Sequence, residues 1–560
     1  MEMGPAYFDT PDVARLQVLL DEVTRAKPGA PETRFVQPEG GLMDRLESRF
    51  HHVLYGRRGT GKSSLLRKTE AALRDRGNLV SWADQETYVG LSYPDVLVST
   101  LADTFAQFAS QLRAVAPPTP ARRFWHRREA APSEHERLAS SLEVLVAQLL
   151  ELKRQPSESQ IEWTASSSAE LAATLTGDGS LELQIGRARG KIGRTRSSTE
   201  SNASTTGITQ KFTASKAEHL EKALTTYRAA IQAVTKTAPD AFIMLDDFYR
   251  LHPDDQPRIA GYFHRAVKDT GVWLKIGTIR YWTRLYSGGA HPTGLQVPHD
   301  IKELSLDRGL LDFKKSKKFL EEILEALASE GQVVVDNLCT AGALDRLVLA
   351  AGGVPRDYIS LVSESIAVAK GRGVSAKSGT ERVIAEDVNE AAGRTVETKF
   401  NDLAEDAGAE ASELRELVVA LTNHCRQTRS ACFLVDFRES DLVARLNRLQ
   451  TMRFVRAIDD NETLPDPRSS RYNVYVLDVS QLAAQRAWQV DFTGWIKRER
   501  RRARKLVFTL SAGEEATEGP QTPGEGAYEQ LALDDELAVV DAIDAPAGSP
   551  LPDGSIAVTS

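Results

Sequence analysis

The sequence predicts an α/β fold in which a mostly parallel sheet is covered by helices on both faces. Apolar runs of strand length occupy residues 52–55, 79–85, 241–248 and 271–280, and helical patterns lie between them. Strands that are apolar throughout are typical of a sheet that is buried on both faces. A glycine-rich stretch follows the first run directly, and a helical pattern follows that stretch.

The glycine-rich stretch reads GRRGTGKS (residues 56–63) and fits the pattern G-x-x-x-x-G-K-[ST]. In this pattern backbone N–H groups surround phosphate oxygens, and the glycines allow a close approach. We expect Lys62 to reach the β- and γ-phosphates and the Ser63 hydroxyl to bind Mg²⁺. The residues predicted to bind nucleotide are Gly56, Arg57, Arg58, Gly59, Thr60, Gly61, Lys62, Ser63, Ser64, Thr278 and Arg356.

Two aspartates end the apolar run AFIMLDDF (241–248). An acidic residue at the end of a buried strand holds the Mg²⁺ in P-loop NTPases, and Asp246 is the candidate for this role. Asp247 is the candidate catalytic residue that orients the attacking water. The alternative is an Asp-Asp turn that only ends a buried strand.

Two later segments place polar residues where a γ-phosphate would lie. The run GVWLKIGTIR ends in Thr278 and Arg280, and a charged Arg280 would sense the γ-phosphate. GGVPRDY (352–358) breaks one helix and starts another, which places Arg356 over the nucleotide. The alternative for Arg280 is an ordinary surface arginine, and the alternative for residues 352–358 is a simple turn between helices. The catalytic candidates are Asp247, Lys62, Arg280 and Arg356.

Taken in order, these segments resemble the AAA+/STAND branch of P-loop NTPases. The chain looks most like ATPases related to the origin-recognition and Cdc-type initiators, well over about 41–400 and more weakly over 410–505. The resemblance implies that Lys62 and Ser63 bind ATP and Mg²⁺, that Asp246 holds the metal, and that Arg356 is a second sensor.

The chain departs from this resemblance at the second aspartate. Typical AAA+ enzymes have Asp-Glu where this chain has Asp246-Asp247, and aspartate is one methylene shorter, which argues against efficient hydrolysis. The Asp-Asp pair, the strand ending T-x-R and the G-x-P of the lid are closer to STAND switch proteins. These proteins hold a nucleotide as a marker of their state.

Changes in composition along the chain predict five regions. A helix, DLVARLNRLQ, precedes two short strands in RFVRAID and RYNVYVLDV, which predicts a winged-helix-like domain. The expected regions are an N-terminal helix and linker (1–40), a P-loop core (41–295) with an insertion at about 117–215, a helical lid (296–405), the winged-helix-like domain (410–505) and an acidic tail (506–560).

Double-stranded DNA, a partner protein and a second copy of this chain are the expected partners. Segments 187–196 and 497–505 are rich in arginine and lysine, and Arg445 and Arg448 are expected on the exposed face of the helix that precedes the two strands. Such residues contact phosphates in DNA complexes. The alternatives are solvated basic loops and pairing with the acidic tail.

The composition indicates a globular protein of the cytoplasm. The chain has 560 residues, is 41% hydrophobic and 26% charged, and has a net charge of −8. No apolar run approaches the roughly 18 residues that span a bilayer, and no signal peptide is visible. The three cysteines lack metal-ligand spacing, which argues against zinc and against a disulfide framework.

These observations predict an ATP-binding, ATP-hydrolysing protein whose nucleotide state controls assembly on DNA or on a partner protein. The alternative is a nucleotide-gated binding module with negligible turnover. A phosphotransferase that uses the same loop is a third hypothesis, but no acceptor-binding motif supports it.

Overall fold

The computed structural model describes residues 7–23, 36, 40–115, 133–155, 158–164, 209–289, 291–307, 313–372, 381–428, 430–463, 471–482 and 504–510. All of them lie in one compact unit, Met1–Leu510. Within these ranges no helix combines the length and the apolarity that crossing a membrane requires. The basic segment 187–196, most of 497–505, and the predicted tail from residue 511 onward lie outside the described residues.

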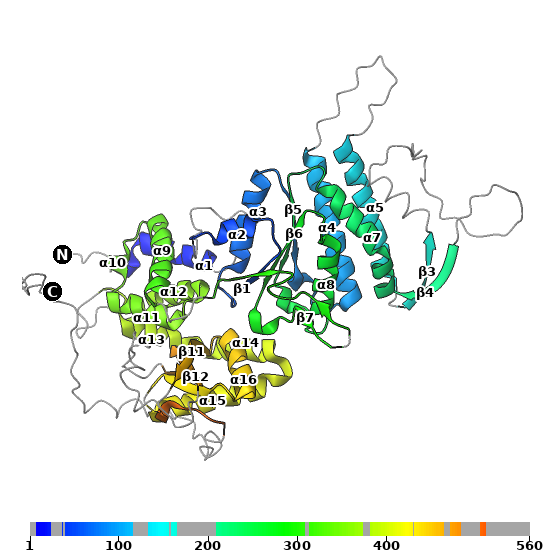
Figure 1. Cartoon of the computed structure of the whole chain (residues 1–560). Coiled ribbons are helices and arrows are strands. Elements are labelled where there is room, and N and C mark those ends of the chain that lie inside the picture. Colours follow the sequence, from blue (N-terminus) through cyan, green and yellow to red (C-terminus); the bar gives the residue numbers. More distant parts are fainter. Residues whose placement is uncertain are drawn as a thin grey trace, which may run out of the picture. The chain divides into compact units, whose positions relative to one another are not determined.

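The core contains a five-stranded parallel sheet, which confirms the predicted fold class (Figure 1). The strand order is β2-β5-β6-β1-β9. Because all neighbours run in parallel, the carboxyl ends of the strands meet at one edge. The strands are β1 (His52–Tyr55), β2 (Leu79–Asp84), β5 (Ala241–Asp246), β6 (Val272–Thr278) and β9 (Lys302–Ser305).

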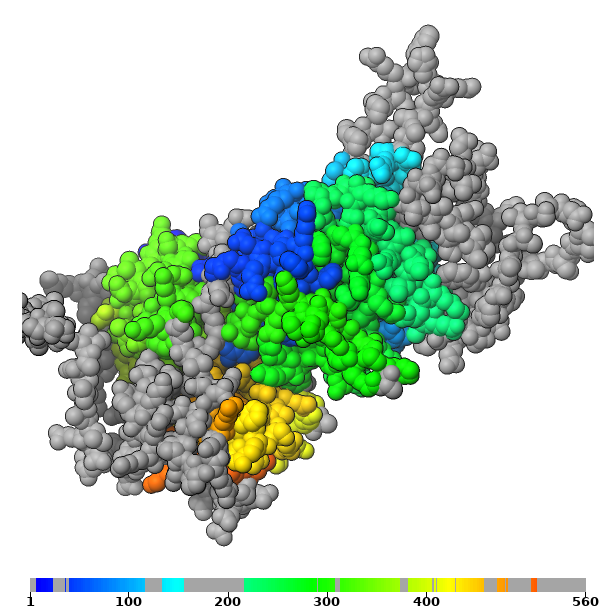
Figure 2. Space-filling model, viewed as in Figure 1, coloured from blue at the N-terminus to red at the C-terminus, as the bar shows by residue number. Residues whose placement is uncertain are grey.

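Helices cover both faces of the sheet, as the apolar strands predicted. One face packs against α2 (Leu42–Glu47) and α3 (Lys62–Asp75), and the other against α4 (Tyr93–Val115) and α8 (Gln256–Val267). Side chains alternate between these layers; on β1, for example, Leu54 faces α3 and its neighbour Val53 faces α4. Figure 2 shows the segment from residue 40 to 75, in blue, on the outside of the green core.

The predicted insertion adds helices to this core. α5 (Glu134–Arg154) and α7 (Lys216–Val234) contribute buried leucines to the same cluster as α4. A capping box between Ser133 and Glu136 begins α5. Beyond these helices, β3 (Glu158–Thr164) and β4 (Thr209–Ser215) form an antiparallel hairpin that the sequence did not predict (Figure 1).

A helical lid follows the sheet and also includes the first helix of the chain. Val13, Leu16 and Leu20 of α1 (Pro11–Glu22) are buried among the lid leucines. Gly331 lies so close that an added Cβ would be 3.1 Å from the Leu16 Cβ. The lid helices are α9 (Phe313–Gly331), α10 (Val335–Leu338), α11 (Ala341–Ala351), α12 (Pro355–Arg372) and α13 (Ala385–Arg394).

The C-terminal domain has helices and a small antiparallel sheet, as expected of a winged helix. Its helices are α14 (Val396–Ala407), α15 (Ala411–Thr428) and α16 (Ser440–Thr451). Its strands, in the order β10-β12-β11, are β10 (Cys432–Asp436), β12 (Arg471–Leu477) and β11 (Val455–Thr463).

β10 and β9 also occur where the sequence predicted no strand. β10 is buried on both faces, with Leu434 in the lid cluster and Phe433 in the C-terminal cluster, so its five residues show no alternation of apolar and polar side chains. β9 lies in a stretch predicted to be helical throughout. That prediction was wrong for residues 302–305, because a four-residue edge strand with one buried side chain is too short to show a strand pattern.

The packing of α1 yields a testable prediction. Leu16→Ala removes a side chain with 0% exposure and should lower the free energy of unfolding by about 2–5 kcal/mol. Val18→Ala on the same helix is the matched control, because Val18 is 58% exposed. Chemical denaturation of both variants measures the difference, and equal effects would contradict the packing of α1 in the lid.

Candidate nucleotide and magnesium site

The glycine-rich loop lies between β1 and α3, at the carboxyl edge of the sheet. Gly59 and Gly61 have positive φ angles of 84° and 92°, which glycine adopts without strain. Gly61 is also the residue that precedes α3, and no side chain caps the helix. The first N–H groups of α3 are therefore oriented as in helix N-termini that bind phosphate.

The Lys62 side chain is buried and hydrogen-bonded to the loop itself. Its ammonium donates hydrogen bonds to the carbonyl oxygens of Gly56 (2.9 Å) and Arg57 (3.3 Å). Burial lowers the pKa of this lysine, and the carboxylates of Asp247 and Asp246 oppose that shift. The lysine is therefore a buried cation near one buried acid, Asp246, and one half-buried acid, Asp247. A phosphate could bind to the cation and a divalent cation to the acids.

Asp246 is the last residue of β5, and one of its two buried carboxylate oxygens lacks a hydrogen bond among the described residues. Ser63 donates a hydrogen bond to its carboxylate, yet Oδ1 is buried and has no partner among the described residues. Burial raises the pKa of Asp246 to about 6, and Asp247 adds to the shift. A hydroxyl and a carboxylate oxygen are hard ligands of the kind that Mg²⁺ binds, so these two residues fit the metal.

Gly277 on the neighbouring strand makes room for this carboxylate. A Cβ on Gly277 would lie 2.6 Å from Oδ1 of Asp246 and 2.7 Å from Cδ1 of Leu66 on α3. Any larger residue would push the aspartate or the helix away. Gly277 was not among the predicted site residues, although a glycine within an apolar strand indicates a close approach.

Asp247 turns the chain away from the sheet. It has φ 48° in the left-handed region, which aspartate tolerates better than most residues. Its carboxylate lies with those of Asp84 and Glu86 within 4.8 Å of one another, at the end of β2. Burial raises the pKa of Asp247, Lys62 opposes this, and Asp84 and Glu86 add to it.

Arg57 fastens the loop to two other segments. Its backbone N–H and its Nε both donate to Oδ1 of Asp307, at 2.8 and 3.2 Å. Its Nη2 donates to the carbonyl of Gly352 in the lid, at 3.3 Å. Asp307 was not among the predicted site residues, because it follows β9, a strand too short to be recognised from sequence.

The lid segment GGVPRDY contacts the loop at Gly59. The backbone N–H of Arg356, at the start of α12, donates to the Gly59 carbonyl at 3.2 Å. An added Cβ on Gly59 would lie 2.8 Å from the Arg356 Cβ. Burial lowers the pKa of Arg356, Asp357 opposes this, and Arg453, Arg58 and Asp247 also act on it. The structure therefore brings Arg356 beside the loop, where the sequence placed it.

The other two predicted sensor residues lie near the loop but have contacts of their own. Thr278 is buried; its carbonyl accepts from the Gly56 N–H at 3.1 Å, and its hydroxyl bonds to that of Thr283. Arg280 pairs with Glu303 of β9 and lies 4.4 Å above the Tyr55 ring. The Ser64 side chain is half-buried, one residue after Ser63 in α3.

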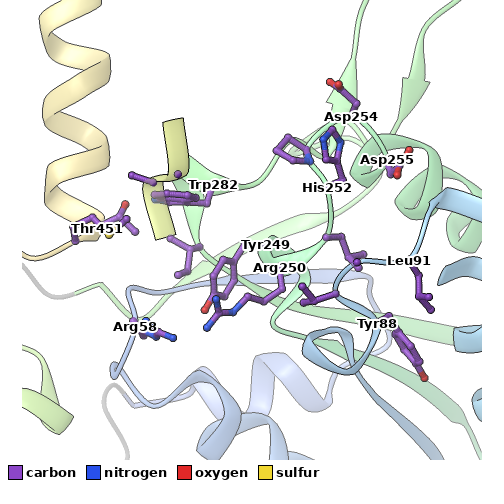
Figure 3. A pocket seen from close by; sticks show the side chains of 18 of the residues that line it. Arg58, Tyr88, Leu91, Tyr249, Arg250, His252, Asp254, Asp255, Trp282 and Thr451 are labelled. Atoms are coloured by element: carbon purple, nitrogen blue, oxygen red, sulfur yellow. The ribbon is translucent and has the colours of Figure 1, made fainter. Parts of the chain in front are cut away.

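A cavity of about 1180 Å³ opens beside the loop (Figure 3). Its lining includes Arg58 of the loop, Tyr249 after β5, Trp282 after β6, and Arg453 of the C-terminal domain. The Tyr249 ring centre is 6.0 Å from the Lys62 ammonium, so the cavity reaches the loop. The volume exceeds that of typical small-molecule sites.

The arginines of α16 are engaged by acidic neighbours. Arg445 pairs with Glu413 at 3.5 Å and Asp441 at 3.2 Å, and Arg448 pairs with Glu410. They are partly exposed, as the sequence predicted, but each already has a counter-charge.

Comparisons with known proteins add two remote structural similarities. No protein-family model matches the chain, and no curated protein does. The structure is similar to that of the Aeropyrum pernix Orc1 protein in complex with DNA (13% identity, 86% of this chain and 97% of that chain, TM-score 0.34). It is also similar to a Walker-type ATPase of Pyrococcus abyssi (12% identity, 82% and 98%, TM-score 0.40). Because both TM-scores are low, the role of each side chain follows from this chain's own geometry.

The raised pKa of Asp246 predicts that this residue destabilises the fold. Its pKa is about 6 in the folded protein against an ordinary value of 3.8, so the folded state holds the proton more tightly than the unfolded chain. The destabilisation is absent below about pH 4 and complete above about pH 6. Without nucleotide, Asp246→Asn should raise the free energy of unfolding at pH 7.5 by about 1–3 kcal/mol.

Denaturation at pH 7.5 and pH 4 measures this effect. The difference between the variant and the native protein should be much smaller at the lower pH, because Asp246 is then protonated in the folded state and partly protonated in the unfolded chain. Asp44→Asn, on α2 away from the loop, is the control and should be close to neutral at both values. If Asp246→Asn lowers the stability at pH 7.5, the ionised Asp246 carboxylate does not destabilise the fold and the prediction is wrong.

Proposed function

We propose that this protein binds ATP with Mg²⁺ at the loop GRRGTGKS and hydrolyses it slowly. The observation that carries the proposal is the buried Oδ1 of Asp246, beside the Ser63 hydroxyl at the start of α3, which has no hydrogen-bond partner in the described part of the chain. A protein that needed Asp246 only for its fold would gain nothing from a desolvated carboxylate oxygen without a hydrogen bond. A divalent cation would supply the missing contact.

The chain's own residues would act as follows. Backbone N–H groups of the loop and of the first turn of α3 hold the phosphates, and the Lys62 ammonium turns from the loop carbonyls to the phosphate oxygens. Ser63 and Asp246 would hold Mg²⁺, which neutralises charge on the phosphates. Asp247 accepts a hydrogen bond from the attacking water and orients it. Arg356 contributes a cation from the lid side.

Nucleotide would connect the core to the lid. Arg356 contacts Gly59 through its backbone, and its guanidinium carries the charge that a phosphate attracts. A triphosphate between the loop and α12 therefore favours a closed lid, and loss of the γ-phosphate weakens that preference. We infer that the lid and C-terminal domain are the output of the nucleotide site, with double-stranded DNA as the partner to test first.

Removal of Lys62 tests the nucleotide site. Lys62→Ala should weaken ATP·Mg²⁺ binding by about 10- to 100-fold, because it deletes a charged donor to the phosphates. Titration calorimetry measures the affinity, and Lys68→Ala, later on the same helix, is the control. Unchanged affinity in Lys62→Ala would overturn the proposal.

A second candidate function is a nucleotide-gated switch with negligible turnover. The observation that favours it is Asp247, a short acid in a left-handed turn where a longer glutamate is usual in AAA+ enzymes. In this case ATP would bind with the same residues and the bound state alone would control the partner.

Asp247→Asn separates the two candidates, since asparagine keeps the shape and tolerates the left-handed turn. If Asp247 orients the water, steady-state ATP hydrolysis should fall about 100-fold while ATP affinity changes less than about threefold. The assay is run with and without double-stranded DNA. Hydrolysis that is absent from the native protein in both conditions would favour the switch.

A further inference from the structure

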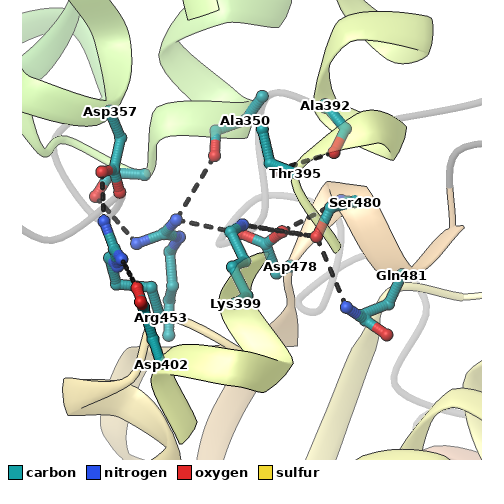
Figure 4. A network of polar contacts seen from close by, with 12 residues as sticks. Ala350, Asp357, Ala392, Thr395, Lys399, Asp402, Arg453, Asp478, Ser480 and Gln481 are labelled. Carbon is teal, nitrogen blue, oxygen red and sulfur yellow. Dashed lines mark hydrogen bonds and ion pairs between the residues drawn. The ribbon is translucent and has the colours of Figure 1, made fainter. Parts of the chain in front are cut away.

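One lid turn is held from both sides, by the phosphate loop and by the C-terminal domain. The turn runs from Gly352 to Asp357 and contains the predicted sensor Arg356. On the loop side it contacts Arg57 and Gly59, as described above. On the other side it contacts Arg453 and Arg456, which flank the start of β11 (Figure 4).

Arg456 fixes the position of the turn. Its guanidinium, fully buried, donates to the carbonyls of Ala350 (3.3 Å) and Gly352 (3.5 Å) and pairs with Asp478 at 3.0 Å. Any Cβ on Gly352 would overlap this guanidinium, at 1.8 Å from its Cζ. The Gly352 carbonyl thus accepts hydrogen bonds from Arg57 of the loop and from Arg456 of the C-terminal domain.

Arg453 holds the residue that follows Arg356. Its Nη1 pairs with Asp357, and its Nη2 donates to Asp402 of α14 at 3.2 Å (Figure 4). The Arg453 and Asp357 side chains are 14% and 13% exposed, so water screens their attraction only weakly. Arg453 itself has φ 69° in the turn between α16 and β11, a conformation that aims its side chain at α12.

Asp357 is paired with Arg453 and also interacts electrostatically with Arg356 and Arg456. Arg356, its chain neighbour, interacts electrostatically with both Asp357 and Arg453. An exposed aspartate would be solvated, but a partly buried one must find a counter-charge. With Arg453 in place, that counter-charge comes from the C-terminal domain. Without Arg453, the arginines that remain near Asp357 are Arg456 and Arg356. Arg456 is already paired with Asp478 at 3.0 Å, so Arg356 is the one that the carboxylate can capture.

We propose that Arg453 is a positioning residue for the nucleotide site: by pairing with Asp357, it prevents that carboxylate from capturing Arg356 and leaves Arg356 to the phosphates. The proposal rests on the proposed function and adds a regulation to it. Any change that separates Arg453 from Asp357 lets this carboxylate compete for Arg356, and nucleotide affinity falls. By reciprocity, bound nucleotide favours the Arg453–Asp357 pair.

Four variants of the full chain test this, with ATP·Mg²⁺ affinity measured by titration calorimetry. Arg453→Ala should weaken binding about tenfold, within the usual range of coupling between sites. Arg453→Lys, which keeps the charge, should restore most of the affinity. The double variant Arg453→Ala with Asp357→Asn should bind within about threefold of the native protein, because the competing carboxylate is gone. Arg372→Ala, which breaks the 2.8 Å pair with Asp387 elsewhere in the lid, is the matched control.

A merely structural role gives a different result. If Arg453 only stabilises the domain contact, the double variant loses a further part of that contact and binds ATP no better than Arg453→Ala; this outcome overturns the proposal. An equal loss of affinity in Arg372→Ala also overturns it. Thermal unfolding of each variant confirms that it is folded. Failure of the native protein itself to bind ATP would instead refute the proposed function, and the positioning role with it.

Discussion

The carbonyl group of Gly352 is the point at which three parts of the molecule meet. It accepts one hydrogen bond from the phosphate loop and one from the C-terminal domain, and both donors are arginines. Glycine is required there, since the space of a side chain is taken by the Arg456 guanidinium. Because a carbonyl has two lone pairs, a single backbone group satisfies both partners at once. The geometry of loop, lid and C-terminal domain is therefore determined together.

The same site contains an acid whose burial is unfavourable for the fold. Asp246 is desolvated and lies beside a second acid, and both raise its pKa. Gly277 lies directly against the carboxylate, which is 3% exposed. Strain of this kind is expected where a protein is organised for a ligand and not for its own stability. The core leucines around the sheet supply the stability that this acid removes.

Most of the core could be predicted from sequence, because local patterns determine it. The strands at residues 52–55 and 241–246, the glycine-rich loop and the helix after it all show their periodicity or their motif directly. β10 and β9 could not be predicted, since one is buried on both faces and the other is too short. At the site, Lys62, Ser63 and Asp246 follow from the motif and the strand end. Asp307 and Arg453 are brought in by tertiary contacts that leave no local pattern.

The small C-terminal sheet has two buried faces that belong to different cores. Leu434 and Val474 pack with the lid helices, whereas Phe433 and Tyr475 pack with α15 and α16. Sliding either layer would expose apolar side chains of the other, so the lid and the C-terminal domain resist relative motion. The two therefore form one packed unit, which contacts the phosphate loop at the turn from Gly352 to Asp357. Under the proposed function, a small rotation at that turn would become a larger displacement at the far helices, so that the binding of a phosphate would move a whole domain.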